Sequence, residues 1–464
     1  MSLLLVLSTM LLLLPSCASG ETTQRSTLVL SDSVEIIQKT HSMLFADLRK
    51  LGHLITFHPV DDPTSLFVDD TTTSTSTSTS TSQWEERKYD TVLMFAPETE
   101  DFLGTLDTEV LTRFVEKGGN LFITATSQSS FLTRELTSQC GVLLEDEREE
   151  KEGGDDNHDA RAIFVSRKWP GVNVVSTTTT VLFPNGVSMS RASSKRMDAV
   201  RRMDEERRRR GRSNILSRSR YTPILQQQRG VSTSSTADLV VAMEARNGAR
   251  VVVVGSDKVC SDMTYNSGPS NRPLCTSILT WVTKETGVLR ATFHMSHVGS
   301  LRDAKDAGDA KNVEETYEMN ETIVVSIVLE ERRRKMLEEE EKEEERWTAH
   351  VASSAIKVNV LSKGGVVVSS FLQQKNTLEQ GEEQGEQQEE KEKEKEKDGM
   401  YRGAVQLPNE HGTYTIQVVY HSPGWSAVER RVHIHVQPAR SATFGLSFWI
   451  AVVVCLTAPL AWIK

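Results

Sequence analysis

The sequence predicts an α/β domain built on a parallel sheet, then an antiparallel β-sandwich, and finally one C-terminal transmembrane helix. Apolar strand-like runs alternate with helical patterns in the first half of the chain, and this alternation is typical of parallel sheets. Strand-like runs without helices between them follow, as in sandwich domains. Residues 444–463 hold no charge, and a helix of that length spans the roughly 30 Å hydrocarbon core of a bilayer.

The first predicted domain, residues 21–287, alternates strands and helices that are joined by short loops. This pattern favours a parallel sheet with helices on both faces, and the expected fold is flavodoxin-like or amidotransferase-like. Four β-branched residues at 251–254, ended by Gly255, predict a further strand of this sheet that is buried on both faces. The other strands are expected at 26–30, 53–60, 89–95 and 120–126, and the helices at 34–51, 107–117, 130–140 and 276–284.

The second predicted domain, residues 288–438, contains strand-like segments with no convincing helix between them. Several of these segments alternate apolar and polar residues, and the last one points Val432, Ile434 and Val436 to one face. An antiparallel sandwich of immunoglobulin-like type is therefore expected. Its strands are predicted at 322–329, 356–360, 403–407, 413–420 and 429–436.

Both ends of the chain carry apolar runs. Residues 3–14 are almost wholly apolar and precede small residues, so residues 1–20 are expected to be a secretory signal peptide. Removal of that peptide would make 444–463 the anchor of a single-pass type I protein with most of the chain lumenal or extracellular. Three arginines, Arg430, Arg431 and Arg440, lie on the lumenal side against the positive-inside rule, and a lipid-anchor signal stays open as the alternative.

Four polar or charged segments interrupt the apolar patterns, at 71–82, 191–220, 331–346 and 379–398. Segment 191–220 holds twelve Lys and Arg residues against four Asp and Glu residues, and it contains no aromatic residue on which a nucleic-acid base could stack. None of the four can bury enough apolar surface to offset its ordering entropy, so we expect surface insertions that are disordered or marginally helical. The net charge of −10 implies no general attraction to nucleic acid.

Of the five cysteines, Cys17 leaves with the signal peptide and Cys455 lies in the predicted membrane segment. The other three would face an oxidising compartment. Cys260 and Cys275 are close in sequence and are a possible disulfide pair, which would leave Cys140 as a buried small hydrophobe.

Several segments outside the insertions resemble one family. They are 241–262, 274–290, 89–102, 114–125, 134–142 and 403–420. Together they are similar to the 48 kDa subunit of dolichyl-diphosphooligosaccharide–protein glycosyltransferase, the endoplasmic-reticulum oligosaccharyltransferase that transfers lipid-linked glycan to asparagine. The resemblance covers roughly two thirds of the chain.

This resemblance implies a non-catalytic subunit, needed for assembly of the complex and for N-linked glycosylation of nascent proteins. It also implies residence in the endoplasmic-reticulum membrane and no cofactor. The implied partners are the catalytic subunit, ribophorin-like subunits and the small defender-type subunit, and no nucleic acid. A type I or lipid-anchored surface adhesion or receptor protein is the alternative, because it would share the topology and the sandwich.

Catalytic and metal-binding patterns are weak. A hydrolase of amidotransferase-like fold needs its nucleophile on a strained turn between glycines, and the chain has neither G-x-C-x-G nor G-x-S-x-G. Cys140 comes late in a predicted helix, where the helix dipole does not activate a thiol. We therefore expect no catalytic, cofactor-binding or metal-binding residue, and we predict that His294, His297 and the 155–159 carboxylates face solvent. Asn320, in the sequon Asn320-Glu321-Thr322, is a possible N-glycan acceptor.

Overall fold

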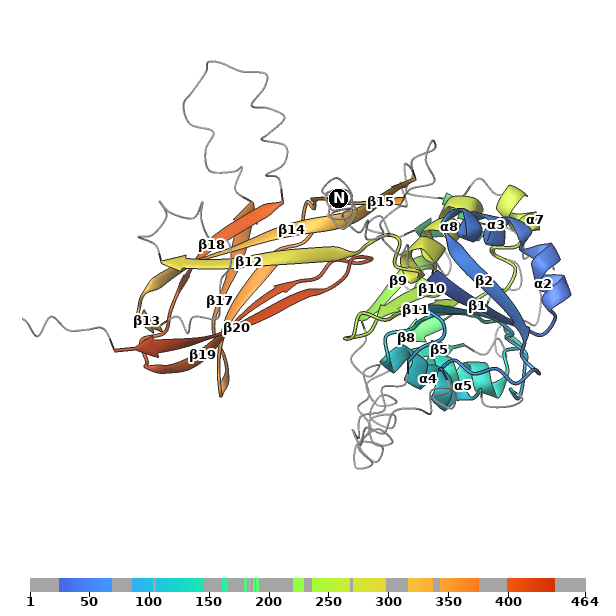
Figure 1. The fold of residues 1–464 in the computed structure, drawn as a ribbon, viewed down its shortest axis with the longest axis horizontal. Coiled ribbons are helices and arrows are strands. Elements are labelled where there is room, and N and C mark those ends of the chain that lie inside the picture. Colours follow the sequence, from blue (N-terminus) through green and yellow to red (C-terminus); the bar gives the residue numbers. More distant parts are fainter. Residues whose placement is uncertain are drawn as a thin grey trace, which may run out of the picture.

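The computed structural model describes two lobes, each built around its own sheet (Figure 1). None of the helices within the described ranges is long and apolar enough to cross a bilayer. The predicted signal peptide, the membrane segment 444–463 and the insertions 71–82 and 379–398 lie outside those ranges, as does most of 191–220. The described residues are 25–68, 86–102, 106–145, 161–165, 179–181, 183, 187, 189–191, 220–228, 236–267, 270–297, 316–336, 343–374 and 399–438.

The first sheet begins with five parallel strands, which confirms the predicted parallel core. If these five are numbered along the chain, their spatial order is 2-1-3-4-5, the doubly wound order of flavodoxin-like folds. The strands, in spatial order, are β2 (His53–Pro59), β1 (Arg25–Ser31), β3 (Thr91–Phe95), β4 (Asn120–Thr124) and β11 (Arg250–Val254).

Beyond β11 the sheet continues with antiparallel strands, which the sequence patterns did not predict. The cause is the short connection 245–249 between β10 and β11, since a loop of five residues can join only antiparallel neighbours. The added strands are β10 (Thr236–Glu244), β9 (Arg220–Gln228), β6 (Arg161–Val165) and β7 (Thr179–Val181), with β8 (Met189–Arg191) on β10 and β5 (Val142–Leu144) on β8.

Helices cover both faces of the parallel part of this sheet, and each face has its own apolar core. On β11, Val252 and Val254 contribute to one core while Val251 and Val253 contribute to the other, so this strand is buried on both faces as predicted. Four helices, α2 (Val34–Thr40), α3 (Ser42–Lys50), α7 (Asp262–Ser267) and α8 (Asn271–Val282), pack on one face, and α4 (Thr108–Glu116) and α5 (Phe131–Gln139) pack on the other.

The prediction of one helix over 34–51 is wrong, because the helix breaks at His41, whose backbone is not helical. The carboxylate of Asp262 accepts hydrogen bonds from the backbone N–H groups of Ser42 at 3.0 Å and Met43 at 2.9 Å. It thereby satisfies N–H groups that would otherwise lack partners at the start of α3.

The described strand pairs of the second sheet are all antiparallel except β13–β20, which is parallel. Its strands enclose one apolar core, to which Ile327, Val358, Ile416 and Val436 each contribute a fully buried side chain. In spatial order the strands are β12 (Leu289–His297), β14 (Thr322–Met336), β18 (Met400–Gln406), β17 (Gly365–Gln374), β16 (Ile356–Ser362), β19 (Gly412–Tyr420), β20 (Val428–Gln437) and β13 (Thr316–Glu318), with β15 (Glu343–Ala349) on β14.

The charged segment 331–346 was predicted to be disordered or marginally helical, and this prediction is wrong for its described part. β14 continues through Met336 and pairs with β15 in an antiparallel register that sets Glu331 opposite Thr348 and Arg332 opposite Trp347. The backbone groups of this charged segment are therefore hydrogen-bonded between two strands. Its base is anchored because Glu331 is buried.

The chain crosses from the first lobe to the second through residues 283–288. Gly287 has φ of 69°, and a Cβ at this position would lie 2.2 Å from the carbonyl oxygen of Gly424 in the second lobe. Only glycine therefore fits, both for its backbone conformation and for the close approach of the two chains.

We predict that Gly287→Ala lowers the free energy of unfolding by roughly 2–5 kcal/mol, through backbone strain and the contact with Gly424. The matched control is Gly52→Ala, whose φ of 81° carries the strain but whose Cβ would meet nothing within 4 Å. The control should cost only about 1–2 kcal/mol. Urea unfolding of the detergent-solubilised protein measures both, and equal losses would show that the contact with Gly424 is unimportant.

Candidate functional site at the junction of the two lobes

The junction is organised around Arg250, the first residue of β11, whose side chain is 1% exposed. Its Nη1 donates to the carbonyl oxygens of Trp281 and Thr286, each at 2.7 Å. Its Nη2 donates to the carbonyl oxygen of Gly287 at 2.7 Å and to Ser426 Oγ at 3.2 Å. One planar guanidinium thus joins the parallel sheet, the end of α8, the crossing segment and the second lobe.

The loop between β19 and β20 supplies the second lobe's half of the junction. Trp281 Nε1 donates to the carbonyl oxygen of Gly424 at 2.8 Å. The backbone N–H of Ser426 donates to the carbonyl oxygen of Gly287, also at 2.8 Å. The carboxylate of Glu244 accepts from the backbone N–H of Ala427 at 3.1 Å. Because most of these bonds use backbone groups, they fix the position of the loop and not only its side chains.

Cations dominate the electrostatics of this junction. Burial lowers the pKa of Arg250 to about 10, while the nearby charge of Glu244 acts in the opposite direction, so the guanidinium stays cationic at neutral pH. Its charge also faces the indole ring of Trp281, with 4.7 Å from Cζ to the ring centroid. Burial, together with the charge of Arg250, lowers the pKa of Lys284 to about 8. Carbonyl oxygens and the face of the Trp281 indole ring therefore stabilise much of the buried charge of Arg250.

A cavity of about 160 Å³ lies beside this junction. It offers two indole rings, an imidazole, one carboxylate and the hydroxyl groups of Thr222 and Ser422, of which the second is already paired with Ser353 Oγ at 2.5 Å. This chemistry suits a few water molecules or a small polar ring better than a reaction. The lining residues are Thr222, Ala242, Glu244, Trp281, His421, Ser422, Pro423, Gly424 and Trp425.

A buried polar chain in the second lobe supports the same loop. His350 lies 3.0 Å from Glu331 Oε2 through Nδ1 and 3.0 Å from Tyr420 Oη through Nε2, and its ring centroid is 4.3 Å from that of Trp425. Burial opposes ionisation of Glu331, yet hydrogen bonds from His350 and Arg333 hold the pKa of Glu331 below its usual range. This hydrogen-bonded chain of carboxylate, imidazole and hydroxyl resembles a catalytic relay. It ends on the fully buried Tyr420, however, so it stabilises the loop.

A second buried cluster lies where the first lobe begins. Glu285 forms an ion pair with Arg25 and accepts a hydrogen bond from His53 Nε2 at 3.3 Å. A carboxylate can only accept, so Nε2 carries the proton and Nδ1 accepts from Thr27 Oγ1 at 3.0 Å. Burial lowers the pKa of His53 to about 4 and outweighs the nearby charge of Asp90. His53 is therefore neutral in the folded protein at physiological pH.

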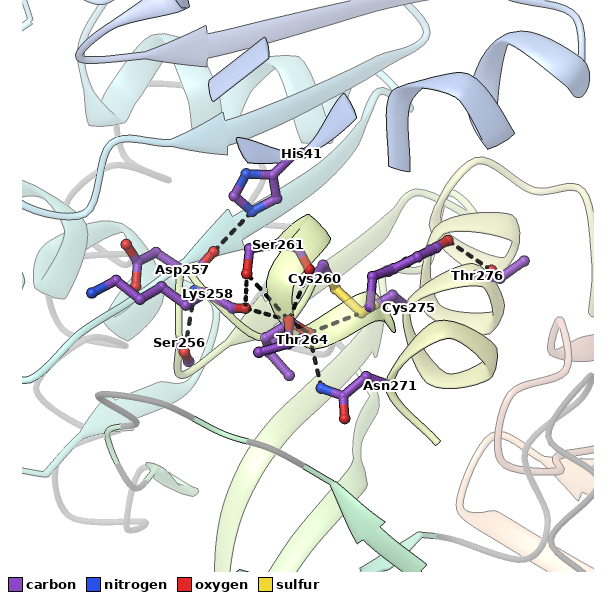
Figure 2. Close-up of a disulfide and its surroundings, with 12 residues drawn as sticks. His41, Ser256, Asp257, Lys258, Cys260, Ser261, Thr264, Asn271, Cys275 and Thr276 are labelled. Carbon is purple, nitrogen blue, oxygen red and sulfur yellow. Dashed lines mark hydrogen bonds between the residues drawn. A yellow bond between two sulfur atoms is a disulfide. The ribbon is translucent and has the colours of Figure 1, made fainter. Parts of the chain in front are cut away.

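Figure 2 shows the disulfide between Cys260 and Cys275, which joins the loop after β11 to α8. Asn271 Nδ2 and Thr264 Oγ1 both donate to the carbonyl oxygen of Val259, at 3.0 Å and 2.9 Å, and so hold the same loop (Figure 2). Cys140 is free and buried, and burial raises the pKa of its thiol to about 12. A thiol with that pKa forms almost no thiolate at neutral pH, so the described structure gives it no nucleophilic role.

The other residues singled out from the sequence do not come together. Within the described ranges, no three His, Cys, Asp or Glu side chains group closely enough to hold a metal ion. His294 is exposed on β12, and the side chain of His297 lies outside the described part of the chain. The 155–159 carboxylates lie outside the described residues. Asn320 is exposed at the turn before β14, and its Nδ2 donates to Asn409 Oδ1 at 2.9 Å.

Comparison with known proteins identifies the family. A sequence model described as "OST48, N-terminal domain" matches residues 18–285, which is more than half of the chain. The chain belongs to the OST48 family. The match spans the whole first lobe as far as Glu285, two residues before the crossing glycine Gly287.

Relatives from an insect, a fish and a plant extend the similarity beyond that lobe. All three are named as the dolichyl-diphosphooligosaccharide–protein glycosyltransferase 48 kDa subunit. The Drosophila melanogaster protein is 24% identical over 451 residues, 91% of this chain and 85% of the relative. The Danio rerio protein is 30% identical over 314 residues, 62% and 63% of the two chains. The Arabidopsis thaliana protein is 23% identical over 443 residues, 90% and 85%.

The patterns in the sequence did not single out Arg250 or Trp281 as partners. A cation placed directly before four consecutive β-branched residues is a usable signal, because such a position at the start of a buried strand demands hydrogen-bond acceptors. The acceptors themselves are backbone carbonyls far along the chain, and no residue type marks them.

We predict that Arg250→Lys lowers the free energy of unfolding by roughly 2–4 kcal/mol. The compact ammonium of lysine cannot reach the four acceptors that the guanidinium fork serves. Urea unfolding followed by tryptophan fluorescence measures the loss. The matched control is Arg272→Lys on α8, an exposed ion pair with Asp47 that should cost less than about 1 kcal/mol. A loss at Arg250 no larger than at Arg272 would contradict the role given to the junction.

The lowered pKa of His53 predicts a pH dependence of stability. Unfolded histidine binds a proton below about pH 6.5, whereas folded His53 does so only below about 4, so the unfolded state binds more protons in that window. Stability should therefore fall by about 3 kcal/mol as the pH drops from about 6.5 to about 4. His53→Gln, which keeps a donor towards Glu285 but does not titrate, should remove that part of the slope. An unchanged slope in equilibrium unfolding would assign the effect to other groups.

Proposed function

We propose that this chain is a non-catalytic subunit of the oligosaccharyltransferase complex, needed for its assembly and for N-linked glycosylation of nascent proteins. Membership of the OST48 family carries this proposal, together with similarity to the fly 48 kDa subunit over 91% of this chain. The comparisons lend no support to the adhesion or receptor alternative.

The junction suits a bracing role. Two lobes with separate cores are held together by a buried guanidinium and by bonds between backbones, and such an arrangement resists relative motion. A subunit of fixed shape can hold an acceptor site and an active site on other subunits in a constant relation. No part of this role requires a nucleophile, a cofactor or a metal ion in the chain itself.

The proposal includes the topology expected from the sequence: a signal peptide at 1–20, lumenal domains at 21–287 and 288–438, and a membrane helix at 444–463. The protein would then reside in the endoplasmic-reticulum membrane as a type I protein. Its proposed partners are the catalytic subunit, ribophorin-like subunits and the small defender-type subunit. Asn320, exposed in its sequon, is the proposed glycan acceptor, and an endoglycosidase shift that Asn320→Gln abolishes would show it.

We predict that depletion of this chain lowers the glycan occupancy of secreted glycoproteins, because a complex without its bracing subunit assembles poorly. The chain, tagged and purified in mild detergent, should carry the catalytic subunit and transfer activity with it. A re-expressed Cys140→Ser chain should restore occupancy fully, since the buried thiol takes no part in chemistry. Loss of transfer activity in that variant, or purification without any glycosyltransferase subunit, would contradict the proposal.

A further inference from the structure

The parallel strands of the first lobe all run away from the junction. Arg250, at the amino end of β11, touches the second lobe, and Arg25, at the amino end of β1, pairs with Glu285 near the crossing segment. The carboxyl ends of these strands therefore lie at the far edge of the lobe, and in Figure 1 α2, which follows β1, lies farthest from the second sheet. We call the residues after these strands, 31–36, 96–102, 125–131 and 255–263, the distal edge.

The strand order makes the distal edge a natural binding surface. The chain leaves β1 for α2 and α3 on one face of the sheet and leaves β3 for α4 on the other face. In doubly wound sheets, ligands bind outside the carboxyl ends of the strands at such a switch point. Here the two loops are linked, because Thr99 Oγ1 donates to the carboxylate of Asp32.

Large exposed apolar side chains flank this edge from both faces of the sheet. Ile36 is 62% exposed, Phe131 is 80% exposed and Met263 is 66% exposed. Each lies in the first turn of the helix that follows a parallel strand, respectively β1, β4 and β11. β1, β4 and β11 end at this same edge of the sheet, with α2 and α7 on one face and α5 on the other. A partner segment that crosses the ends of the strands would therefore meet apolar side chains on both faces.

The distal edge is also strongly acidic. Its exposed side chains include five carboxylates and one lysine, Lys258, among the described residues. A concentration of one charge attracts a partner of the other sign and fixes its orientation. The five carboxylates are Asp32, Glu35, Glu98, Glu100 and Asp101.

We propose that the distal edge docks a segment of another protein that carries apolar side chains flanked by Lys or Arg. This inference rests on the proposed function, since it names the surface by which the chain meets a partner subunit. A second copy of this chain is disfavoured, because two acidic edges repel each other. An anionic lipid surface is disfavoured for the same reason.

Site-specific photo-crosslinking tests the proposal in the full chain within its purified complex. A photoreactive phenylalanine replaces Phe131 in one preparation and Leu54 in the other. Leu54 is a matched control, because it is 53% exposed but stands at the amino end of β2, at the opposite edge of the same sheet. We expect position 131 to crosslink to a segment of another protein in which Lys or Arg flanks apolar residues, and position 54 not to reach that segment.

A variant measures how much the apolar group contributes. The triple change Ile36→Ser, Phe131→Ser and Met263→Ser should lower recovery of the crosslinked partner by roughly tenfold or more, while Leu54→Ser leaves recovery unchanged. All four side chains are exposed, and equal thermal midpoints would show that the variants fold. Raising the salt concentration should weaken the contact, because screening removes the attraction of the carboxylates.

Three results would overturn the proposal: a crosslink from position 131 to residues 191–220 of this chain, a crosslink to a second copy, or no crosslink beyond that of position 54. The failure of the proposed function is a separate result. If the wild-type chain purified without any glycosyltransferase subunit but position 131 still captured a basic apolar segment, the docking surface would stand and the assignment to that complex would not.

Discussion

A single buried guanidinium determines how the two lobes of this protein are positioned relative to each other. Arg250 donates to three backbone carbonyls and one hydroxyl, and these acceptors belong to α8, to the crossing segment and to the β19–β20 loop. Burying a charge costs free energy unless its hydrogen bonds are made. The desolvation of the guanidinium is therefore offset only when all of these parts are in place together. Folding of the first lobe and docking of the second are thereby coupled.

The same constraint explains the details around it. Gly287 is needed because the crossing chain passes against Gly424, and Trp281 both covers the guanidinium and donates to that same loop. The buried Glu331–His350–Tyr420 chain stiffens the loop from the side of the second lobe. An accessory subunit that works through its shape requires this kind of rigidity, and the distal edge then stands at a fixed place relative to the second lobe.

How far the sequence predicts this structure depends on how local the cause is. The strand 251–254 and its burial on both faces follow from four β-branched residues in a row, and the structure confirms both. The break at His41 comes from Asp262, which caps α3 from far along the chain, and no pattern near residue 41 contains that information. The pairing of β14 with β15 was missed because its charges suggested solvation, whereas the segment forms one strand of an antiparallel pair. Arg250 was missed for a similar reason, since its acceptors are carbonyls that only the fold brings together.

The distance between the lobes tests this account most directly. Spin labels on cysteines introduced at Lys39 on α2 and Lys357 on β16, both exposed, would report it in a chain whose Cys455 is replaced by serine and whose Cys140 is buried. Pulsed electron–electron double resonance on the detergent-solubilised protein should give one narrow distribution of distances between the labels, because the junction allows one arrangement of the lobes. A broad or two-peaked distribution would show that the lobes move independently and that Arg250 does not hold them.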